Sequence, residues 1–228
     1  VTSPKPPDKH VLSWVEHFLG GKHQTVAGSL IGTNNLYMRN AVGTNGYTRP
    51  DTSNANTAPT LGVCEVGSGN SSGDCIVVEM DNGVSSSNVF YVGRITRLNN
   101  FSLYFEFKVD TNGDFHFGLS NNSSTASAPT RFIGIKAVSG TTNFQFEATN
   151  GTPTTVDSGV PVDSGWHNFE LTHNGTDWGM SIDGGAVSVV SQTVSDGLSV
   201  TLAAWVKSNS AGAQKAYIDT IKLYGEAP

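Results

Sequence analysis

The sequence predicts an all-β protein, an antiparallel sandwich of two sheets, and three observations support this. Charged residues make up only 14% of the 228 residues, and glycine reaches 26, a composition that does not favour long helices. Short β-branched and aromatic runs follow one another along the chain. Turns rich in Gly, Asn and Ser separate these runs at short spacing, as in sandwiches and barrels.

The clearest strand is FSLYFEFKV, in which four apolar side chains from Phe101 to Phe107 share one face. The segment DTNGD then predicts a turn, and FHFGLS is expected to return with Phe115, Phe117 and Leu119 inward. Further strands are predicted at RFIGIKAV, NFQFEAT, VSVVSQ, VTLAAWV and AYIDTIKLYG.

The stretch GWHNFELTHNGTDWGMSIDGG, over 165–185, contains two histidines, two aspartates and a glutamate. Its alternation places His167 and His173 on the apolar face, too far apart to hold a metal without a third ligand. NGTD is a turn sequence, and both aspartates occupy turn positions. We therefore predict a hairpin that packs rather than a catalytic strip.

One domain is expected over 14–228, because no repeat and no second composition regime interrupts it. Residues 1–13 are predicted to form a Pro-rich, charged connecting arm; a disordered end without a role is the alternative. The net charge of −6 and the lack of a Lys/Arg cluster argue against a nucleic-acid partner. No apolar run approaches the ~18–20 residues of a membrane helix, so no membrane partner is expected.

The two cysteines, Cys64 and Cys75, each lie in an apolar run, and the turn-forming stretch GSGNSSGD separates them. This pattern predicts a hairpin that brings the two residues opposite each other and joins them in a disulfide. Such a bridge would place the protein outside a reducing cytosol. Two buried thiols are the alternative interpretation.

Polar residues at outward positions suggest a ligand surface, provided that the strands adjoin in one sheet. By alternation these positions are Tyr104, Glu106, His116, Arg131, Gln145 and Glu147. An aromatic ring, an arginine and planar polar groups suit a sugar, whereas a merely solvated face is the alternative.

Trp205 has the opposite parity to Leu202, Ala204 and Val206. It is therefore predicted to point outward, into a contact with a ligand or a neighbouring subunit.

Four segments occur in a familiar order: EHFLGG at 16–21, then APTLGVCEV, then GWHNFELTHNGTDWGMSIDG, and AYIDTIKLYG at 216–225. In sequence and spacing they resemble the opening strand, the strand after the first long loop, the tryptophan hairpin and the closing strand of one fold family. That family is the laminin-G-like, concanavalin A-like jelly rolls, in particular those of bacteriophage structural and tail proteins. The resemblance covers roughly residues 14–225.

The resemblance implies a non-catalytic structural or adhesive domain, on a virion or outside the cell, in a homo-oligomer or larger assembly. A glycan or a cell-surface receptor is the partner that it implies. The alternative is a secreted carbohydrate-binding module or a glycan-active enzyme of the same fold.

No catalytic residues are predicted. Glucanases of this fold carry carboxylates in the pattern Glu-x-Asp-x-x-Glu, and the nearest match, VEMDNG with Glu79 and Asp81, lacks the third. Lyases of this fold use a Gln-x-His strand, whereas NFQFEA has no such histidine and FHFG has no such glutamine.

No cofactor is predicted, but Asp219 leaves one metal site open. By alternation it shares a face with Ile221 and Leu223, where a carboxylate needs a partner. The resemblance implies a structural calcium there, held by Asp219 with Glu16 and the carbonyls of Gly20–Gly21. The alternatives are that Asp219 accepts backbone N–H bonds or that the strand faces the other way.

Overall fold

The structure, a computed structural model, describes most of the second half of the chain and parts of the first. The described residues are 11–16, 29–31, 36–42, 47–50, 63–68, 71–72, 75–80, 90–91, 99–109, 113–120, 131–150, 152–190, 199–209 and 214–226. For residues up to 50, and for 75–80 and 90–91, it describes the backbone alone. The part of the predicted arm at 1–10 lies outside these residues.

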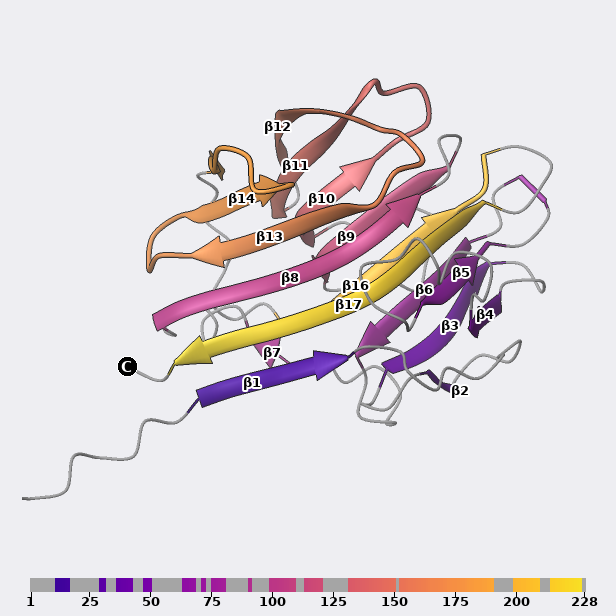
Figure 1. The fold of residues 1–228 in the computed structure, drawn as a ribbon, viewed down its shortest axis with the longest axis horizontal. Coiled ribbons are helices and arrows are strands. Elements are labelled where there is room, and N and C mark those ends of the chain that lie inside the picture. Colours follow the sequence, from indigo (N-terminus) through magenta and orange to yellow (C-terminus); the bar gives the residue numbers. More distant parts are fainter. Residues whose placement is uncertain are drawn as a thin grey trace, which may run out of the picture.

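The strands form two antiparallel sheets stacked face to face, as Figure 1 shows. In one sheet the order is β15-β14-β13-β8-β17-β5-β4, and β1 also pairs with β17. Its strands are β1 (Val11–Glu16), β4 (Tyr47–Pro50), β5 (Cys64–Gly67), β8 (Asn99–Val109), β13 (His167–His173), β14 (Trp178–Ile182), β15 (Ser188–Val190) and β17 (Lys215–Glu226).

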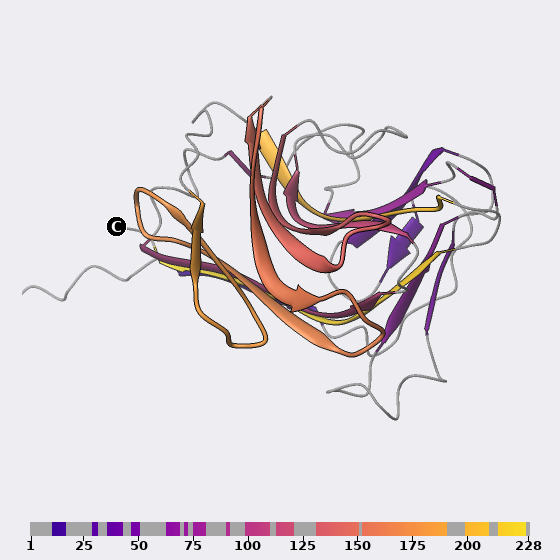
Figure 2. The ribbon, with the colours of Figure 1, turned by 90° about the horizontal axis from the view of Figure 1, so that it is seen from above.

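The other sheet has the order β12-β11-β10-β9-β16-β6-β3-β2, and β7 also pairs with β16. Its strands are β2 (Ser29–Ile31), β3 (Leu36–Val42), β6 (Cys75–Met80), β7 (Phe90–Tyr91), β9 (Asp114–Ser120), β10 (Arg131–Ala137), β11 (Asn143–Asn150), β12 (Pro153–Pro161) and β16 (Ser199–Lys207). In Figure 2 both sheets curve in the same sense. We call the first the convex sheet and the second the concave sheet, after their outer faces.

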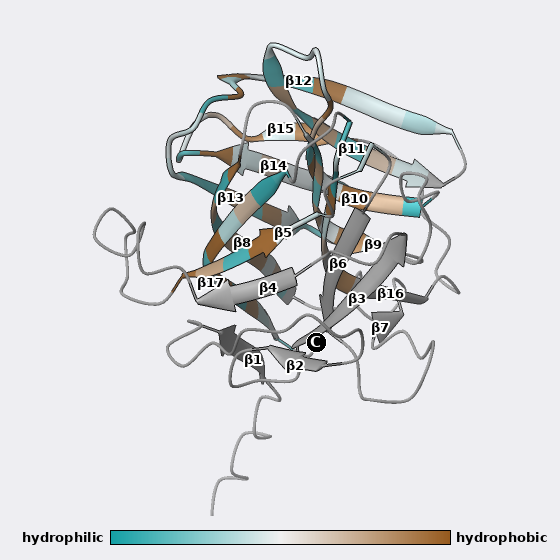
Figure 3. Cartoon of the chain, turned by 90° about the vertical axis from the view of Figure 1, so that its right-hand side faces the viewer, coloured by the Kyte–Doolittle hydropathy of each residue, from teal (hydrophilic) through white to brown (hydrophobic). Residues whose placement is uncertain are grey.

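The core lies between the sheets and follows the predicted alternation. Along β8 every second residue from Phe101 to Val109 is buried, and Figure 3 shows hydrophobic and hydrophilic residues along the strands of both layers. Rings from the two sheets meet in the middle, for example Phe107 and Phe117 with centroids 4.9 Å apart. The predicted all-β sandwich of two antiparallel sheets is confirmed.

The hairpin predicted at 165–185 is also confirmed. β13 and β14 pair from Phe169↔Ile182 to His173↔Trp178, and in the turn the Asn174 side-chain oxygen accepts the N–H groups of Thr176 (2.9 Å) and Asp177 (2.8 Å).

Two other predicted hairpins are wrong because the chain changes sheet between their strands. β8 pairs with β13 and β17 in the convex sheet, whereas β9 pairs with β10 and β16 in the concave sheet. Likewise Cys64 is on β5 of the convex sheet and Cys75 on β6 of the concave sheet. Cys64 is a buried thiol whose Sγ lies 3.8 Å from the carbonyl oxygen of Glu65. The predicted disulfide is therefore not supported.

β17 departs from the predicted alternation through a β-bulge. Its register with β8 shifts between Ile218 and Thr220, where Asp219 is the extra residue. Ile218 and Ile221 both belong to the core, so the alternation is interrupted at Asp219 and simple parity does not assign its face. β1 does lie beside β17, with Glu16 opposite Ile221. β1 begins at Val11, within the predicted arm.

No described helix is long and apolar enough to span a membrane.

Candidate functional site

The outer face of the concave sheet carries one line of side chains across five neighbouring strands. Register places Asp157 of β12 opposite Gln145 of β11, then Lys136 of β10, His116 of β9 and Trp205 of β16. Directly opposite residues of an antiparallel pair point to the same face. We call these five residues the concave row. Four strand spacings make it roughly 19 Å long.

Exposure falls steadily along the concave row. Asp157 is exposed and Gln145 and Lys136 are half-buried, whereas His116 is 4% and Trp205 1% exposed. The row thus leads from the sheet edge at β12 into a closed centre.

An aromatic cluster forms that closed centre. The His116 ring meets Phe132 at 5.1 Å and Trp205 at 5.0 Å between centroids, both edge to face. Phe132 has room because Gly134 lies beside it: an added Cβ there would approach the Phe132 ring to 2.9 Å. Gly134 pairs with Gly118 on the next strand, where φ is +154° and an added Cβ would overlap the carbonyl oxygen of Ile133. Glycine is required at both positions for the strands to approach so closely.

Two polar atoms in this cluster are buried without a hydrogen-bond partner in the described part of the chain: Nδ1 of His116 and Nε1 of Trp205. Burial, together with the nearby Lys136 ammonium, lowers the pKa of His116 to about 3, so the imidazole is neutral at physiological pH. A buried polar group without a partner costs on the order of 1–3 kcal/mol. Because both atoms are fully buried, neither is open to a ligand in this structure.

An ion pair flanks the cluster. Lys136 Nζ contacts Glu147 Oε2, and the two side chains are 16% and 8% exposed. The Thr155 hydroxyl lies 3.4 Å from the same carboxylate oxygen. Glu147 is opposite Gly134 and Thr155 in the register, so this pair lies beside the concave row on the same face.

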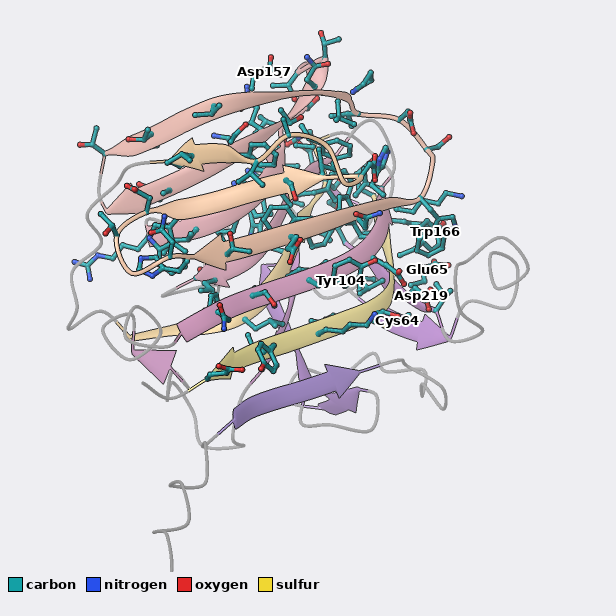
Figure 4. All side chains as sticks on the ribbon, turned by 60° about the vertical axis from the view of Figure 1, so that its left-hand side comes forward. Cys64, Glu65, Tyr104, Asp157, Trp166 and Asp219 are labelled. Atoms are coloured by element: carbon teal, nitrogen blue, oxygen red, sulfur yellow. The ribbon has the colours of Figure 1, made fainter. Side chains whose placement is uncertain are left out.

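The predicted outward positions divide between the two sheets. His116, Gln145 and Glu147 lie on the concave face, as the alternation requires. Tyr104 and Glu106 are on β8 of the convex sheet, so the predicted surface does not exist as one patch. Figure 4 shows Tyr104, Glu65 and Asp219 on strands of the convex sheet, with Trp166 just before β13, all away from Asp157 on β12.

Tyr104 and Glu106 form their own arrangement on the convex sheet. The Tyr104 hydroxyl donates to Glu106 Oε1 at 2.6 Å, and Lys222 Nζ lies 4.8 Å from the ring centroid. Burial and this hydrogen bond raise the pKa of Tyr104.

Arg131 does not join the predicted surface. It is exposed, but it has the parity of the core residues Ile133 and Ile135. Phe132 takes the outer face instead. Apolar residues occur at both parities in RFIGI, so alternation alone did not indicate which side of β10 faces outward.

The predicted parity of Trp205 is confirmed, because it lies opposite His116 and away from the core cluster. Its predicted exposure is wrong, since only 1% of it is accessible. On the outer face its ring meets His116 edge to face, a contact that the sequence of β16 alone does not reveal.

Two carboxylates of the concave face, Glu79 and Glu147, are too far apart to form a glycosidase pair. Glu79 of β6 and Glu147 of β11 share one register line, through Ala203, Gly118 and Gly134. Four strand spacings separate their backbones by roughly 19 Å, whereas retaining pairs need about 5 Å and inverting pairs up to about 9.5 Å. Asp81 lies outside the described residues.

Metal ligands do not gather in the described part of the chain, where no group of three or more His, Cys, Asp or Glu side chains is placed to hold an ion. Asp219 is fully buried, at 0% exposure. Gly20 and Gly21, its implied partners in a calcium site, lie outside the described residues.

No family model matches the sequence, and no curated protein matches it. Solved structures do match. A protein of unknown function from Shewanella oneidensis MR-1 has a TM-score of 0.62 at 12% identity and covers 95% of this chain and 87% of its own. A β-1,3-glucanase from Mycobacterium marinum has a TM-score of 0.56 at 12% identity, with coverages of 92% and 97%. The carbohydrate recognition domain of Emp47p has a TM-score of 0.53 at 9% identity, with coverages of 93% and 94%.

The fold is that of the concanavalin A-like sandwiches. At these identities the likeness shows the fold alone.

Sequence reasoning missed Lys136, Phe132 and Asp157 as residues of the concave face. The signal for Lys136 was present, because RFIGIKAV places it at the parity opposite to Ile133 and Ile135.

Proposed function

We propose that this domain binds carbohydrate on its concave face and has no catalytic activity. The observation that supports binding is the accessible part of the concave row, where a carboxylate, an amide and an ammonium group follow one another across three neighbouring strands. Sugars are bound by planar polar groups set beside aromatic rings. The glucanase and the carbohydrate recognition domain among the similar structures have the same fold, and both are named for carbohydrate.

The absence of catalysis is proposed from the surroundings of the carboxylates. Glu79 and Glu147 are too far apart to act as a pair. Glu147 is engaged by Lys136 and Thr155, and Asp157, on the neighbouring strand, accepts hydrogen bonds from Asn143 and the Gly159 N–H. We expect no release of reducing or unsaturated ends from β-glucan, xylan or alginate. Turnover that disappears in Glu79→Gln or Asp81→Asn would overturn this part of the proposal.

Binding is tested by a glycan array followed by calorimetry on the best ligand. Gln145→Ala removes an amide that is half-buried on the concave row, and we expect it to weaken binding about tenfold, since a lost hydrogen bond to a ligand costs about 1.4 kcal/mol. Lys222→Ala is the matched control on the convex sheet and should leave the affinity unchanged. Equal losses in both variants, or no glycan ligand at all, would contradict the proposal.

The narrower proposal, a bacteriophage-type structural or adhesive domain on a virion or outside the cell, depends on the sequence resemblance alone. The extracellular placement has lost the support of the predicted disulfide. Solution mass tests the assembly: a stable trimer or larger oligomer favours this narrower function, and a monomer favours an independent carbohydrate-binding module.

A further inference from the structure

The turn of the β13–β14 hairpin contains an asparagine followed by a glycine. Asn174, Gly175 and Thr176 are all exposed, and Gly175 has a φ of +97°, in the left-handed region that favours glycine. In such a pair the backbone nitrogen of the glycine is a nucleophile for the carboxamide carbon of the asparagine. Gly175 has no side chain to hinder that approach, and solvent reaches the carboxamide.

A histidine contacts this nucleophile. The Gly175 N–H donates to Nδ1 of His173 at 3.1 Å, within the distance over which a general base takes a proton. Because Nδ1 accepts this hydrogen bond, it presents a lone pair to the nitrogen that must lose its proton. His173 is buried, which lowers its pKa, and the Asp177 carboxylate opposes this shift. The residues that pair with His173 on either side, Phe101 and Trp178, are uncharged.

Two backbone N–H groups point at the carboxamide oxygen. Oδ1 of Asn174 accepts the N–H of Thr176 at 2.9 Å and that of Asp177 at 2.8 Å. Attack on the carboxamide carbon places negative charge on this oxygen, and donors that are already in position stabilise such a charge; one donor of this kind contributes on the order of 10²–10³ in rate in enzymes. The turn thus gathers a nucleophile, a base and oxyanion donors around one carboxamide.

We propose that Asn174 is a site of spontaneous modification, at which the folded turn catalyses its own deamidation. The Gly175 nitrogen forms a bond to the carboxamide carbon of Asn174 while its proton passes to Nδ1 of His173. The bond from that carbon to the side-chain nitrogen then breaks, and this nitrogen takes the proton and leaves as ammonia. Water opens the cyclic imide and leaves aspartate or isoaspartate at position 174. The inference is independent of glycan binding.

The first experiment compares folded and unfolded protein. Both are incubated at neutral pH, the second in urea, and peptide mass spectrometry follows the replacement of NH₂ by OH at Asn174. We expect the folded protein to react at least about tenfold faster there, because only the fold holds the base and the donors in place. A folded protein that reacts at the same rate as the unfolded chain, or more slowly, would refute the proposal.

The second experiment removes the base. His173→Phe keeps an aromatic ring beside Trp178, and the rate at Asn174 is expected to fall at least about tenfold. Four further Asn-Gly pairs, at 45–46, 82–83, 112–113 and 150–151, are internal references whose rates should not change. Acidification should slow the wild type more steeply than the variant, since a protonated imidazole accepts no proton.

His116→Phe is the matched control: it makes the same substitution at a buried histidine of the concave sheet and should leave the rate at Asn174 unchanged. Thermal melts establish that both variants are folded. An unchanged rate in His173→Phe, or an equal loss in His116→Phe, would refute the role given to His173. If His173→Phe does not fold, the comparison of folded with unfolded wild type still decides the proposal.

Discussion

His116 shows how one residue acquires its properties from its neighbours. In the sequence it occupies an outward position of an alternating strand, where an exposed histidine would keep its ordinary pKa. In the fold two glycines on adjacent strands let Phe132 close over one side of the ring, and Trp205 closes the other. The ring is thereby removed from water, and its charged form becomes unfavourable.

This burial makes the stability of the fold sensitive to acid. The pKa of His116 is about 3 in the folded state and near 6.5 in an unfolded chain. Since the folded pKa is the lower one, the unfolded state binds the proton first, and stability falls as pH drops from about 6.5 toward 3. One histidine contributes at most about 1.4 kcal/mol per pH unit in that window.

Urea unfolding at several pH values checks this, with His116→Phe as the comparison. The variant should show a smaller loss on acidification. Some acid sensitivity should remain, because burial also lowers the pKa of His173. Identical slopes in the two proteins would refute the role given to His116.

At the scale of elements, a histidine between two aspartates links the end of the β13–β14 hairpin to the segment before β13. His167 Nδ1 lies 2.7 Å from Asp183 Oδ2, and its Nε2 lies 3.2 Å from Asp163 Oδ1. Asp183 also accepts the Asn168 N–H at 2.9 Å while holding a φ of +53°. The hairpin end and the segment leading from β12 into β13 are thereby joined through one imidazole.

Removing Asp183 should loosen both connections. Asp183→Ala is expected to lower the free energy of unfolding by about 1–2 kcal/mol, because it loses the hydrogen bonds to Asn168 and His167 and places alanine at positive φ. Asp183→Asn keeps an oxygen for Asn168 and tolerates that φ, so it should lose less than half as much. Chemical unfolding measures the free energy of unfolding of both variants. Equal losses of this free energy would mean that the charge of Asp183, and not the backbone geometry at this position, dominates its effect.

Local patterns predicted the elements of this fold well, and they failed where the answer depended on distant strands. Alternation identified the buried face of β8, and NGTD identified the β13–β14 turn, because both are properties of consecutive residues. The neighbours of β8 and β9 are set by strands far along the chain, so the expected hairpin was wrong. For the same reason, alternation placed Trp205 on the correct face but did not indicate its contact with His116 on a distant strand. Alternation also could not detect the bulge at Asp219.

At the scale of the whole molecule, the two cysteines belong to different sheets and Cys64 is a thiol in the core. The fold should therefore not depend on a disulfide. We expect thermal melts with and without a reducing agent to coincide, and denatured, unreduced protein to react with a thiol reagent. A melting temperature that falls on reduction would restore the predicted bridge.

The order of strands also has a consequence for how the chain folds. The last two strands, β16 and β17, lie inside the sheets, and they connect the early strands to the rest: β6 reaches β9 only through β16, and β5 reaches β8 only through β17. Among the strands that the structure describes, those before β8 find no partner in the later half of the chain until residues 199–226 emerge from the ribosome. We therefore expect a slow, late closing step dominated by distant contacts, during which open strand edges are exposed to aggregation.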